Sequence, residues 1–482
     1  MTPLRVLSVA SEIYPIIKTG GLADVAGALP GALADCGIAM RTLVPGYPDV
    51  IKATTAAEEL LNLQNFYGGR ARLLSGSAAG LDLLVLDAPH LFARPGNPYL
   101  TPEGKDWPDN GLRFAALARM AAEIGTGAVA AWVPDIVQAH DWQAGLAHAF
   151  LHYGRGRRPG TVMTVHNLAY QGLFSQEMLG TIGLPPESFH VHGVEFYGKI
   201  SFMKAGLQFA DRITTVSPTY AVEIQDDEGG MGLGGLLRER SAVLSGILNG
   251  IDTAVWNPAT DLQIAARFGI DTLQHRPANK LALQQRFGLD PKPAAPLLGV
   301  ISRLSWQKGL DLLLANLDTI LGEGMQLALL GSGERELQEG YEAAARAHPG
   351  RIGVVIGYDE ALAHLIQAGS DALVVPSRFE PCGLTQLCAL RYGAVPIVSR
   401  VGGLEDTIVD ADDASRPPTG FKFAPVTSDA LAGTLRRASG AFHDKPVWQR
   451  LQRNGLSTDV SWRERANRYA ELYREIVAAR GA

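Results

Sequence analysis

Three turns in this chain carry charged residues and glycines directly after an apolar run, where a strand is expected to end. The first is KTGGL, in which Lys18, Gly20 and Gly21 follow the apolar residues 4–10. Glycines at a strand-to-helix turn let backbone N–H groups approach an anion, and the helix N-terminus adds positive partial charge. The G-x-G-x-x-G order of a dinucleotide-binding loop does not occur at this turn. The turn therefore predicts either an anion site of another kind or a solvated loop lysine.

The second turn is SRLSWQKGLDLL, in which Arg303 ends an apolar run and Lys308 follows shortly after it. Arginine offers phosphate oxygens a planar fork, and lysine acts as a mobile point charge. Two cations at a strand-to-helix turn suit a diphosphate, although a surface ion pair would also explain them. The nearby GSGE, residues 331–334, lacks the third glycine of a nucleotide fingerprint and is interpreted as a plain tight turn.

The third turn is SRFEPCGLTQL, in which Glu380 lies at the expected rim of the sheet. The backbone amides of Gly383, Leu384 and Thr385, at the start of the next helix, would point at an anion. A carboxylate beside such a helix start suits a hydroxyl-rich group joined to a phosphate, so the turn predicts a sugar-nucleotide site. Cys382 alone is interpreted as a small buried residue, since the cysteines have no metal-ligand spacing.

Two histidines also follow apolar runs, His140 in AHDWQAG and His166 in TVHNLAYQG. A lone histidine at a strand end is more often structural, but two at one rim favour a functional site. Asp141 could orient one of them or hold a sugar hydroxyl. Ligands of open α/β sheets bind outside the carboxyl ends of the strands. Polar residues at such positions in both halves of the chain therefore predict one cleft between two domains.

The composition excludes several classes of protein. The 482 residues are 46% hydrophobic and 19% charged, with a formal net charge of −6. A chain of this charge is poorly suited to nucleic acid or an anionic membrane surface, and it is too long for one compact core. Its three cysteines form no CxxC pair, which suits a reducing compartment. With no apolar run of membrane-spanning length and no room for a leader before the first strand, a cytoplasmic protein is expected.

Short β-branched apolar runs alternate with helical patterns along the chain, which is typical of doubly wound α/β domains. The expected strands lie near residues 4–10, 41–44, 81–87, 135–139, 161–166, 212–216, 297–302, 326–330, 352–356, 372–376 and 395–399. Between the two halves, LNGIDTAVWNPATD has the Gly, Asn and Pro residues of a hinge. We therefore expect an N-terminal domain over 1–247 and a C-terminal domain over 248–458.

The final segment, residues 459–482, is expected to form an amphipathic helix. Its apolar positions at helical spacing are Trp462, Ala466, Tyr469, Tyr473 and Ile476.

KTGGL, HDWQ, VHN, LNGID, SRLSWQKGLDLL, SRFEPCGLTQL and VGGLEDT together resemble the bacterial glycogen synthases and the plant starch synthases. The match runs in order over essentially the whole chain. The resemblance implies a retaining glycosyltransferase of GT-B architecture, with two Rossmann-like domains facing a deep cleft and a final helix that crosses back to the N-terminal domain. It also implies transfer of glucose from ADP-glucose to the non-reducing end of an α-1,4-glucan. No metal or cofactor is expected, because cations are placed to serve the diphosphate.

The resemblance implies a role for each matching residue. Lys18 in the KTGGL motif would bind the sugar nucleotide, Arg303 and Lys308 would bind its diphosphate, and Glu380 would be the essential carboxylate. The residues implied to line the sugar pocket are His166, Asn249, Asp141 and Cys382. Tyr358 would stack near the adenine. Many retaining relatives carry a second glutamate where this chain has Cys388, so the residue that holds the ribose is not assigned.

Breaking a glucosyl–phosphate bond builds positive charge on the sugar and negative charge on the departing ADP. Arg303, Lys308 and the amides of residues 383–385 would stabilise the diphosphate, while closure of the domains would exclude water. Retention would follow from front-face attack, with an ADP oxygen helping to deprotonate the acceptor. A double displacement would need a carboxylate on the opposite face of the sugar, and the sequence does not place one there.

Two alternative functions remain open at this stage. A phosphorylase of similar architecture would need a lysine for pyridoxal phosphate, and no unassigned lysine stands out for that role. A non-catalytic glucan- or nucleotide-binding protein would be expected to have lost part of the group Glu380, Arg303 and Lys308, which is intact here.

Overall fold

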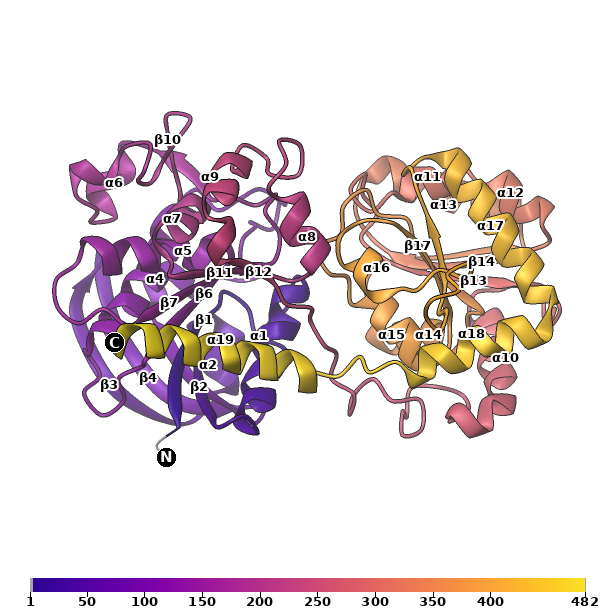
Figure 1. Ribbon diagram of the computed structural model, residues 1–482, viewed down its shortest axis with the longest axis horizontal. Helices are drawn as coiled ribbons and strands as arrows, with labels where there is room; N and C mark the ends of the chain where they lie inside the picture. The colour runs from indigo at the N-terminus through magenta and orange to yellow at the C-terminus, as the bar shows by residue number, and fades with distance from the viewer. Residues whose placement is uncertain (1–2, 482) are drawn as a thin grey trace. The chain divides into compact units, whose positions relative to one another are not determined.

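The computed structural model describes residues 3–481, which form two compact units (Figure 1). The first unit contains the chain up to Asn249 together with the chain from Trp462 onward, and the second contains Gly250–Ser461. Each unit has a largely parallel β-sheet with helices on both of its faces (Figure 1). The prediction of two doubly wound α/β domains is confirmed.

The first unit is built on a nine-stranded sheet with the order β12-β11-β7-β6-β1-β2-β5-β4-β3. Its parallel strands are β1 (Leu4–Val9), β2 (Ile38–Pro45), β5 (Leu81–Asp87), β6 (Ile136–His140), β7 (Gly160–Val165), β11 (Arg212–Thr215) and β12 (Leu244–Gly246). Every strand that the sequence predicts in this half is present, within three residues of its expected ends.

Two antiparallel strands at the edge of this sheet, β3 (Thr55–Phe66) and β4 (Gly69–Ala78), are not apparent in the sequence. The residues of β3, TAAEELLNLQNF, have no clean alternation of apolar and polar side chains, and most of them are exposed. An edge strand buries little of its surface, so the period of two that identifies a half-buried strand is weak here.

Helices and a small second sheet complete the first unit. The helices are α1 (Gly21–Ala34), α2 (Pro48–Ala53), α3 (Pro89–Phe92), α4 (Asn110–Thr126), α5 (Asp141–Tyr153), α6 (Met178–Thr181), α7 (Phe202–Phe209), α8 (Pro218–Glu223), α9 (Gly234–Glu239) and two 3-10 turns at Pro186–Ser188 and Ser241–Val243. The small sheet has the order β8-β10-β9, formed by Leu173–Ser175, Lys199–Ser201 and Glu195–Phe196.

The C-terminal helix α19 (Arg463–Gly481) packs on the first unit, as the resemblance implies. The predicted apolar positions Trp462, Ala466, Tyr469, Tyr473 and Ile476 are all buried there. They form one cluster with residues of α1, β1, β6 and β7. The O–H of Tyr473 also donates a hydrogen bond to the amide oxygen of Gln138 in β6. The helix is therefore part of the first unit's core.

The second unit has a six-stranded, fully parallel sheet with the order β15-β14-β13-β16-β17-β18. Its strands are β13 (Leu297–Ile301), β14 (Gln326–Gly331), β15 (Ile352–Ile356), β16 (Ala372–Val375), β17 (Val395–Ser399) and β18 (Phe421–Phe423). The helices are α10 (Arg276–Arg286), α11 (Leu310–Leu314), α12 (Leu317–Gly322), α13 (Arg335–Ala347), α14 (Glu360–Gly369), α15 (Thr385–Tyr392), α16 (Gly402–Thr407), α17 (Ser428–His443), α18 (Lys445–Ser457) and a 3-10 turn at Ile270–His275.

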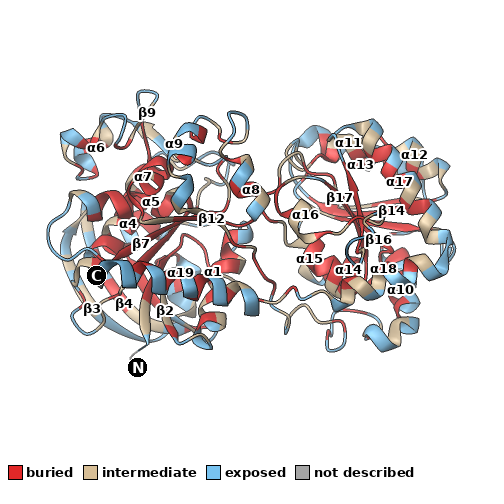
Figure 2. Cartoon of the chain, viewed as in Figure 1, coloured by how far each residue is buried: buried red, intermediate tan, exposed pale blue. Residues whose placement is uncertain are grey.

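Burial follows the layers of each unit. The central strands of both sheets are buried, while the helices expose their outer faces (Figure 2). This explains why the central strands are continuous apolar runs in the sequence, since a parallel strand is covered on both faces. Among residues 3–481, no helix is both long and apolar enough to cross a membrane.

Candidate functional site

Glu380 and Lys308, which the sequence analysis assigns to different parts of the ligand, are in direct contact in the second unit. The Nζ of Lys308 lies 2.6 Å from Oε2 of Glu380, and Ser377 Oγ donates a 2.9 Å hydrogen bond to the same oxygen. Glu380 follows β16 and is 6% exposed. A charge-assisted bond of this length fixes the carboxylate in one orientation. The pair therefore gives the site a positioned carboxylate with a cation beside it.

The two loops that carry this pair are held together by close packing and by a buttressing arginine. Gly309 has φ +66°, and a Cβ there would lie 1.9 Å from the carbonyl oxygen of Pro376. The two terminal nitrogens of Arg378 each donate to a carboxylate oxygen of Asp311, both at 2.7 Å. The same guanidinium lies 4.5 Å from the centre of the Trp306 ring. Arg378 was missed by the sequence analysis, although it stands inside the SRFEP motif.

The turn from Cys382 to Thr385 is locked by the side chain of Gln386. Gly383 adopts the left-handed region with φ +71°. The amide nitrogen of Gln386 donates to the carbonyls of Cys382 and Gly383, both at 2.9 Å. The helix predicted to start within CGLTQ is present as α15, whose first residue is Thr385 and whose N-cap is Leu384. Gln386 is not among the predicted site residues, although its polar side chain in the first turn of a buried helix was an available signal.

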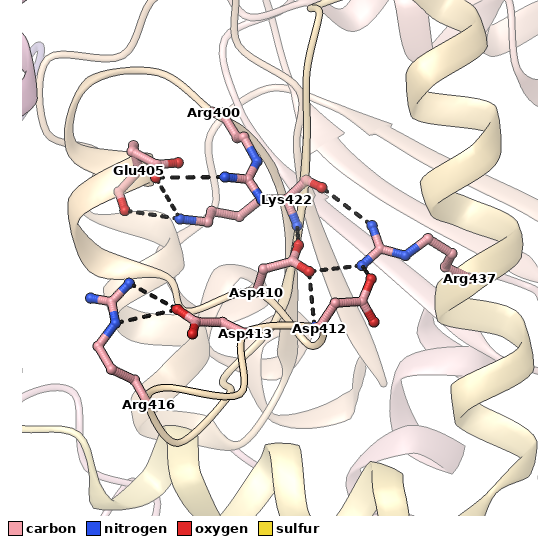
Figure 3. Close-up of polar contacts among 8 residues, drawn as sticks. All are labelled: Arg400, Glu405, Asp410, Asp412, Asp413, Arg416, Lys422 and Arg437. Atoms are coloured by element: carbon pink, nitrogen blue, oxygen red, sulfur yellow. Dashed lines mark hydrogen bonds and ion pairs between the residues drawn. The ribbon is translucent and has the colours of Figure 1, made fainter.

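The start of α16 lies against the same turn. The N–H of Gly403 donates a 3.0 Å hydrogen bond to the carbonyl of Glu380, and a Cβ on Gly403 would lie 2.2 Å from the carbonyl oxygen of Cys382. Lys422 of β18 pairs with Glu405 of α16 at 2.8 Å, within the group of charged residues shown in Figure 3. This pair anchors α16, which in turn supports the backbone of Glu380.

Arg303 and Tyr358 lie at the carboxyl ends of β13 and β15, and both side chains are exposed. Tyr358 is 73% exposed, and its O–H donates a 2.7 Å hydrogen bond to Glu360. The GSGE segment, predicted to be a tight turn, instead continues β14 in an extended form, with Gly333 in a parallel β-bridge to Leu304. A Cβ on Gly333 would lie 2.1 Å from the carbonyl of Leu304, so close backbone packing explains this glycine without a nucleotide.

In the first unit, Asp141 and His166 lie together at the carboxyl ends of β6 and β7. Asp141 has φ +55°, a left-handed conformation in which aspartate is enriched. Its Oδ1 accepts the N–H of His166 at 2.7 Å and that of Asn167 at 3.4 Å. Both Asp141 and His166 are 8% exposed. Nδ1 of His140 lies 2.8 Å from Nε2 of His166, so both histidines noted in the sequence belong to one group.

Burial raises the pKa of Asp141 to about 7, although the amides of His166 and Asn167 lower it in part. The folded protein therefore binds a proton here more tightly than the unfolded chain, in which an aspartate titrates near pH 4. The stability contributed by the protonated form is fully present below about pH 4 and is lost as the pH rises to about 7.

Asp141→Asn should make the folded protein more stable than the wild type at pH 8, by about 4 kcal/mol at most. The amide keeps an acceptor for the two N–H groups and removes the buried charge. Urea unfolding at pH 8 and pH 5 measures the difference, which should shrink at pH 5. An Asn variant that is equally destabilised at both pH values would contradict this electrostatic account.

Lys18 is ion-paired in the structure. Its Nζ lies 2.8 Å from Oδ1 of Asp24, and the lysine side chain is 34% exposed. The ammonium also lies 5.3 Å from the centre of the Tyr14 ring. Lys18 therefore makes an exposed ion pair beside the first turn of α1, and its binding of an anion stays a prediction.

The KTGGL loop is closed by a carboxylate that the sequence analysis missed. Glu12 is 3% exposed. It accepts hydrogen bonds from Thr19 Oγ1 at 2.6 Å, from the N–H groups of Thr19 and Gly20, and from the O–H of Tyr99. The amide of Gly20 was expected to face an anion, and it is instead bonded to Glu12. Gly21 begins α1 directly after this bond.

Asn249 lies at the end of the first unit and is 4% exposed. Its side-chain oxygen is buried and has no hydrogen-bond partner among the described residues. A buried acceptor without a partner is uncommon in native proteins and calls for an explanation, such as a bound water or ligand. This orphaned oxygen supports the assignment of Asn249 to a polar site.

The predicted residues thus fall into two sets, one at the carboxyl edge of each sheet. The first unit's set is Lys18, Gly20, Gly21, Asp141, His166 and Asn249. The second unit's set is Arg303, Lys308, Tyr358, Glu380, Cys382, Gly383, Leu384 and Thr385. Two Rossmann-like units with such edges, one of them carrying a lysine-paired carboxylate beside two helix starts, fit the two-domain class of sugar-nucleotide glycosyltransferases.

Comparisons with known proteins agree with this class. The family model described as the starch synthase catalytic domain matches residues 5–239, and the model for glycosyl transferases group 1 matches residues 283–455. Glycogen synthase 2 of Bradyrhizobium diazoefficiens is 73% identical over the full length of both chains. A glycogen synthase of Rhodopseudomonas palustris is 63% identical, covering 100% of this chain and 99% of that relative.

Among solved structures, the catalytic domain of starch synthase IV from Arabidopsis thaliana, bound to ADP and acarbose, superposes with a TM-score of 0.90. It is 33% identical to this chain and covers 99% of it, and all of that domain is matched. The chain belongs to the family of bacterial glycogen synthases and starch synthases.

Proposed function

We propose that this protein transfers glucose from ADP-glucose to the non-reducing end of an α-1,4-glucan such as glycogen, with retention of configuration and release of ADP. The observation that carries the proposal is the full-length identity of 73% to a protein named glycogen synthase. The ADP in the similar starch synthase structure supports adenine as the base of the donor. We further propose that the protein works in the cytoplasm, in glycogen biosynthesis, without contact with membranes or nucleic acid.

The charged residues of the second unit fit the chemistry of the donor. When the glucosyl–phosphate bond breaks, negative charge develops on the leaving diphosphate. Arg303, Lys308 and the helix start at Gly383–Thr385 would stabilise that charge, because preorganised donors cost no reorganisation during the reaction. Glu380, already oriented by Lys308 and Ser377, would lie beside the sugar as it gains positive charge.

The first unit would supply the remaining contacts to the sugar. Asp141 and His166 are held at one edge by hydrogen bonds, which suits them to bind glucosyl hydroxyls. Lys18 would reach the sugar nucleotide from its loop. With ADP as leaving group, one of its oxygens would accept the proton of the acceptor hydroxyl on the same face of the sugar, which accounts for retention without a second carboxylate.

The donor assignment can be tested by nucleotide release. Purified protein is incubated with glycogen and either ADP-glucose or UDP-glucose, and free ADP or UDP is measured over time. We expect ADP release that depends on glycogen, with UDP release much slower. Faster turnover of UDP-glucose would contradict adenine as the base of the donor nucleotide, but it would still agree with a glucosyltransferase.

We expect catalysis without a divalent metal ion. Among residues 3–481, no group of three or more His, Cys, Asp or Glu side chains is placed to hold a metal ion, and the cations Arg303 and Lys308 can neutralise the diphosphate. Activity should therefore survive excess EDTA. A near-total loss of activity that Mn²⁺ or Mg²⁺ restores would overturn the assignment of these two residues to the leaving group.

A further inference from the structure

Three buried side chains from neighbouring strands form a hydrogen-bonded row that ends at the site. Ser8 Oγ in β1 lies 3.2 Å from Nε2 of His140 at the end of β6. The other ring nitrogen of His140, Nδ1, lies 2.8 Å from Nε2 of His166, which directly follows β7. Ser8 is 1% exposed and His140 is 0% exposed, whereas His166 is 8% exposed. The row therefore runs from the core to the rim of the sheet.

The hydroxyl of Ser8 determines which atom donates in each hydrogen bond of this row. Its hydroxyl has His140 Nε2 as its single side-chain partner among the described residues. A buried hydroxyl hydrogen without an acceptor is costly, so Ser8 must donate to Nε2. Nε2 of His140 is then an acceptor, and its Nδ1 carries the proton and donates to Nε2 of His166. In the reverse direction the hydrogen of Ser8 would be buried with no acceptor.

Both histidines stay neutral, which keeps this direction fixed. Burial lowers the pKa of His140 to about 4. The pKa of His166 lies well below its usual value because of burial and the neighbouring His140. Among the described residues, no carboxylate is hydrogen-bonded to either ring, whose partners are Ser8 and the other ring. Asp141 Oδ1 accepts two backbone amides, and Glu12 is bonded to the KTGGL loop.

We propose that Ser8 and His140 are positioning residues that hold His166 in its Nδ1–H tautomer, so that it offers a hydrogen-bond donor to a hydroxyl of the donor glucose. The Nδ1 of His166 has no hydrogen-bond partner among the described residues. In this tautomer His166 cannot act as a base from Nδ1. The inference rests on the proposed function for the identity of the sugar, but the tautomer itself does not depend on activity.

Nitrogen-15 NMR of the protein labelled at histidine tests the tautomer directly, because protonated and unprotonated ring nitrogens have well separated shifts. The His166 signals are assigned by their loss in His166→Gln. At pH 7 we expect a protonated Nδ1 and an unprotonated Nε2 at His166 in the wild type. A protonated Nε2 at His166, or an imidazolium, would overturn the proposal whatever the activity of the protein.

Two matched variants separate positioning from packing. His140→Asn places an amide N–H close to the position of Nδ1, so it can still donate to His166. His140→Asp has the same size, but its ionised carboxylate can only accept a hydrogen bond, which forces the proton of His166 onto Nε2. We expect kcat/KM for ADP-glucose to fall roughly tenfold in the Asn variant and at least about 100-fold in the Asp variant.

The NMR spectrum of each variant and its melting temperature complete the comparison. The proposal predicts that the Asp variant shows protonated Nε2 at His166 and the Asn variant does not. If both variants are folded and lose activity equally, His140 acts by packing alone and the proposal is wrong. If the Asp variant does not fold, the wild-type spectrum and the Ser8→Ala variant, which should show a mixture of tautomers, decide the question.

Discussion

Glu380→Ala is expected to lower kcat about 10²- to 10³-fold while the protein stays folded, which is the size of the loss when one preorganised transition-state contact is removed. The carboxylate is held by Lys308 at 2.6 Å and by Ser377 at 2.9 Å, so its position is fixed before substrate binds. Its effect should be greatest as charge develops on the sugar. The loss should therefore appear mainly in kcat and less in KM for ADP-glucose.

The matched control is Glu339→Gln, which removes an exposed glutamate of α13 whose partner is Arg335 in the same helix. This variant should keep the wild-type kcat. Steady-state rates at saturating glycogen, together with a melting curve for each variant, make the comparison. If Glu380→Ala stays within a few-fold of the wild-type kcat, Glu380 is a structural residue and the catalytic assignment fails.

Lys18→Gln is expected to raise KM for ADP-glucose by about 10- to 150-fold, since a charge-assisted hydrogen bond contributes about 1.5–3 kcal/mol. The ion pair of Lys18 with Asp24 is partly exposed, so breaking it should cost the fold little. We propose that this lysine binds the sugar nucleotide when the domains approach. Lys18→Arg should be less impaired than Lys18→Gln, because it keeps the charge but changes its shape.

The control for charge alone is Lys52→Gln, which changes an exposed lysine of α2 in the same unit. KM for ADP-glucose should be unchanged in this variant. The measurement is KM and kcat for the wild type and the three variants at saturating glycogen. One shared KM for the wild type, Lys18→Arg and Lys18→Gln would show that Lys18 does not bind the donor.

The central strands could be predicted because each one can be identified from its own residues alone. A parallel strand covered on both faces is an uninterrupted apolar run, and the short β-branched segments of this chain fall on the strands of both sheets. The apolar spacing of the C-terminal helix likewise predicted which side chains of α19 are buried. The edge strands β3 and β4 lack such a pattern, since exposure removes the selection for apolar residues.

The contacts within the site were less predictable because they join distant parts of the chain. Lys308 and Glu380 are 72 positions apart. A surface ion pair was one interpretation of Lys308, but nothing in the sequence identified Glu380 as its partner or placed the pair below the surface. In the sequence, nothing distinguishes Glu12 from any other acidic residue after a strand, yet its carboxylate accepts the hydrogen bonds that close the KTGGL loop. Arg378 and Gln386 stand inside quoted motifs, but only the fold reveals that they brace the loops around Glu380.

The most direct test of the central claim follows the transferred sugar itself. ADP-glucose labelled with ¹³C at C1 is incubated with a maltooligosaccharide, and the product is observed by NMR while ADP is measured in the same sample. We predict a labelled α-1,4 linkage at the non-reducing end, formed in equal amount to the ADP released. ADP release that yields free labelled glucose, a β-linked product, or no labelled oligosaccharide at all would contradict the account.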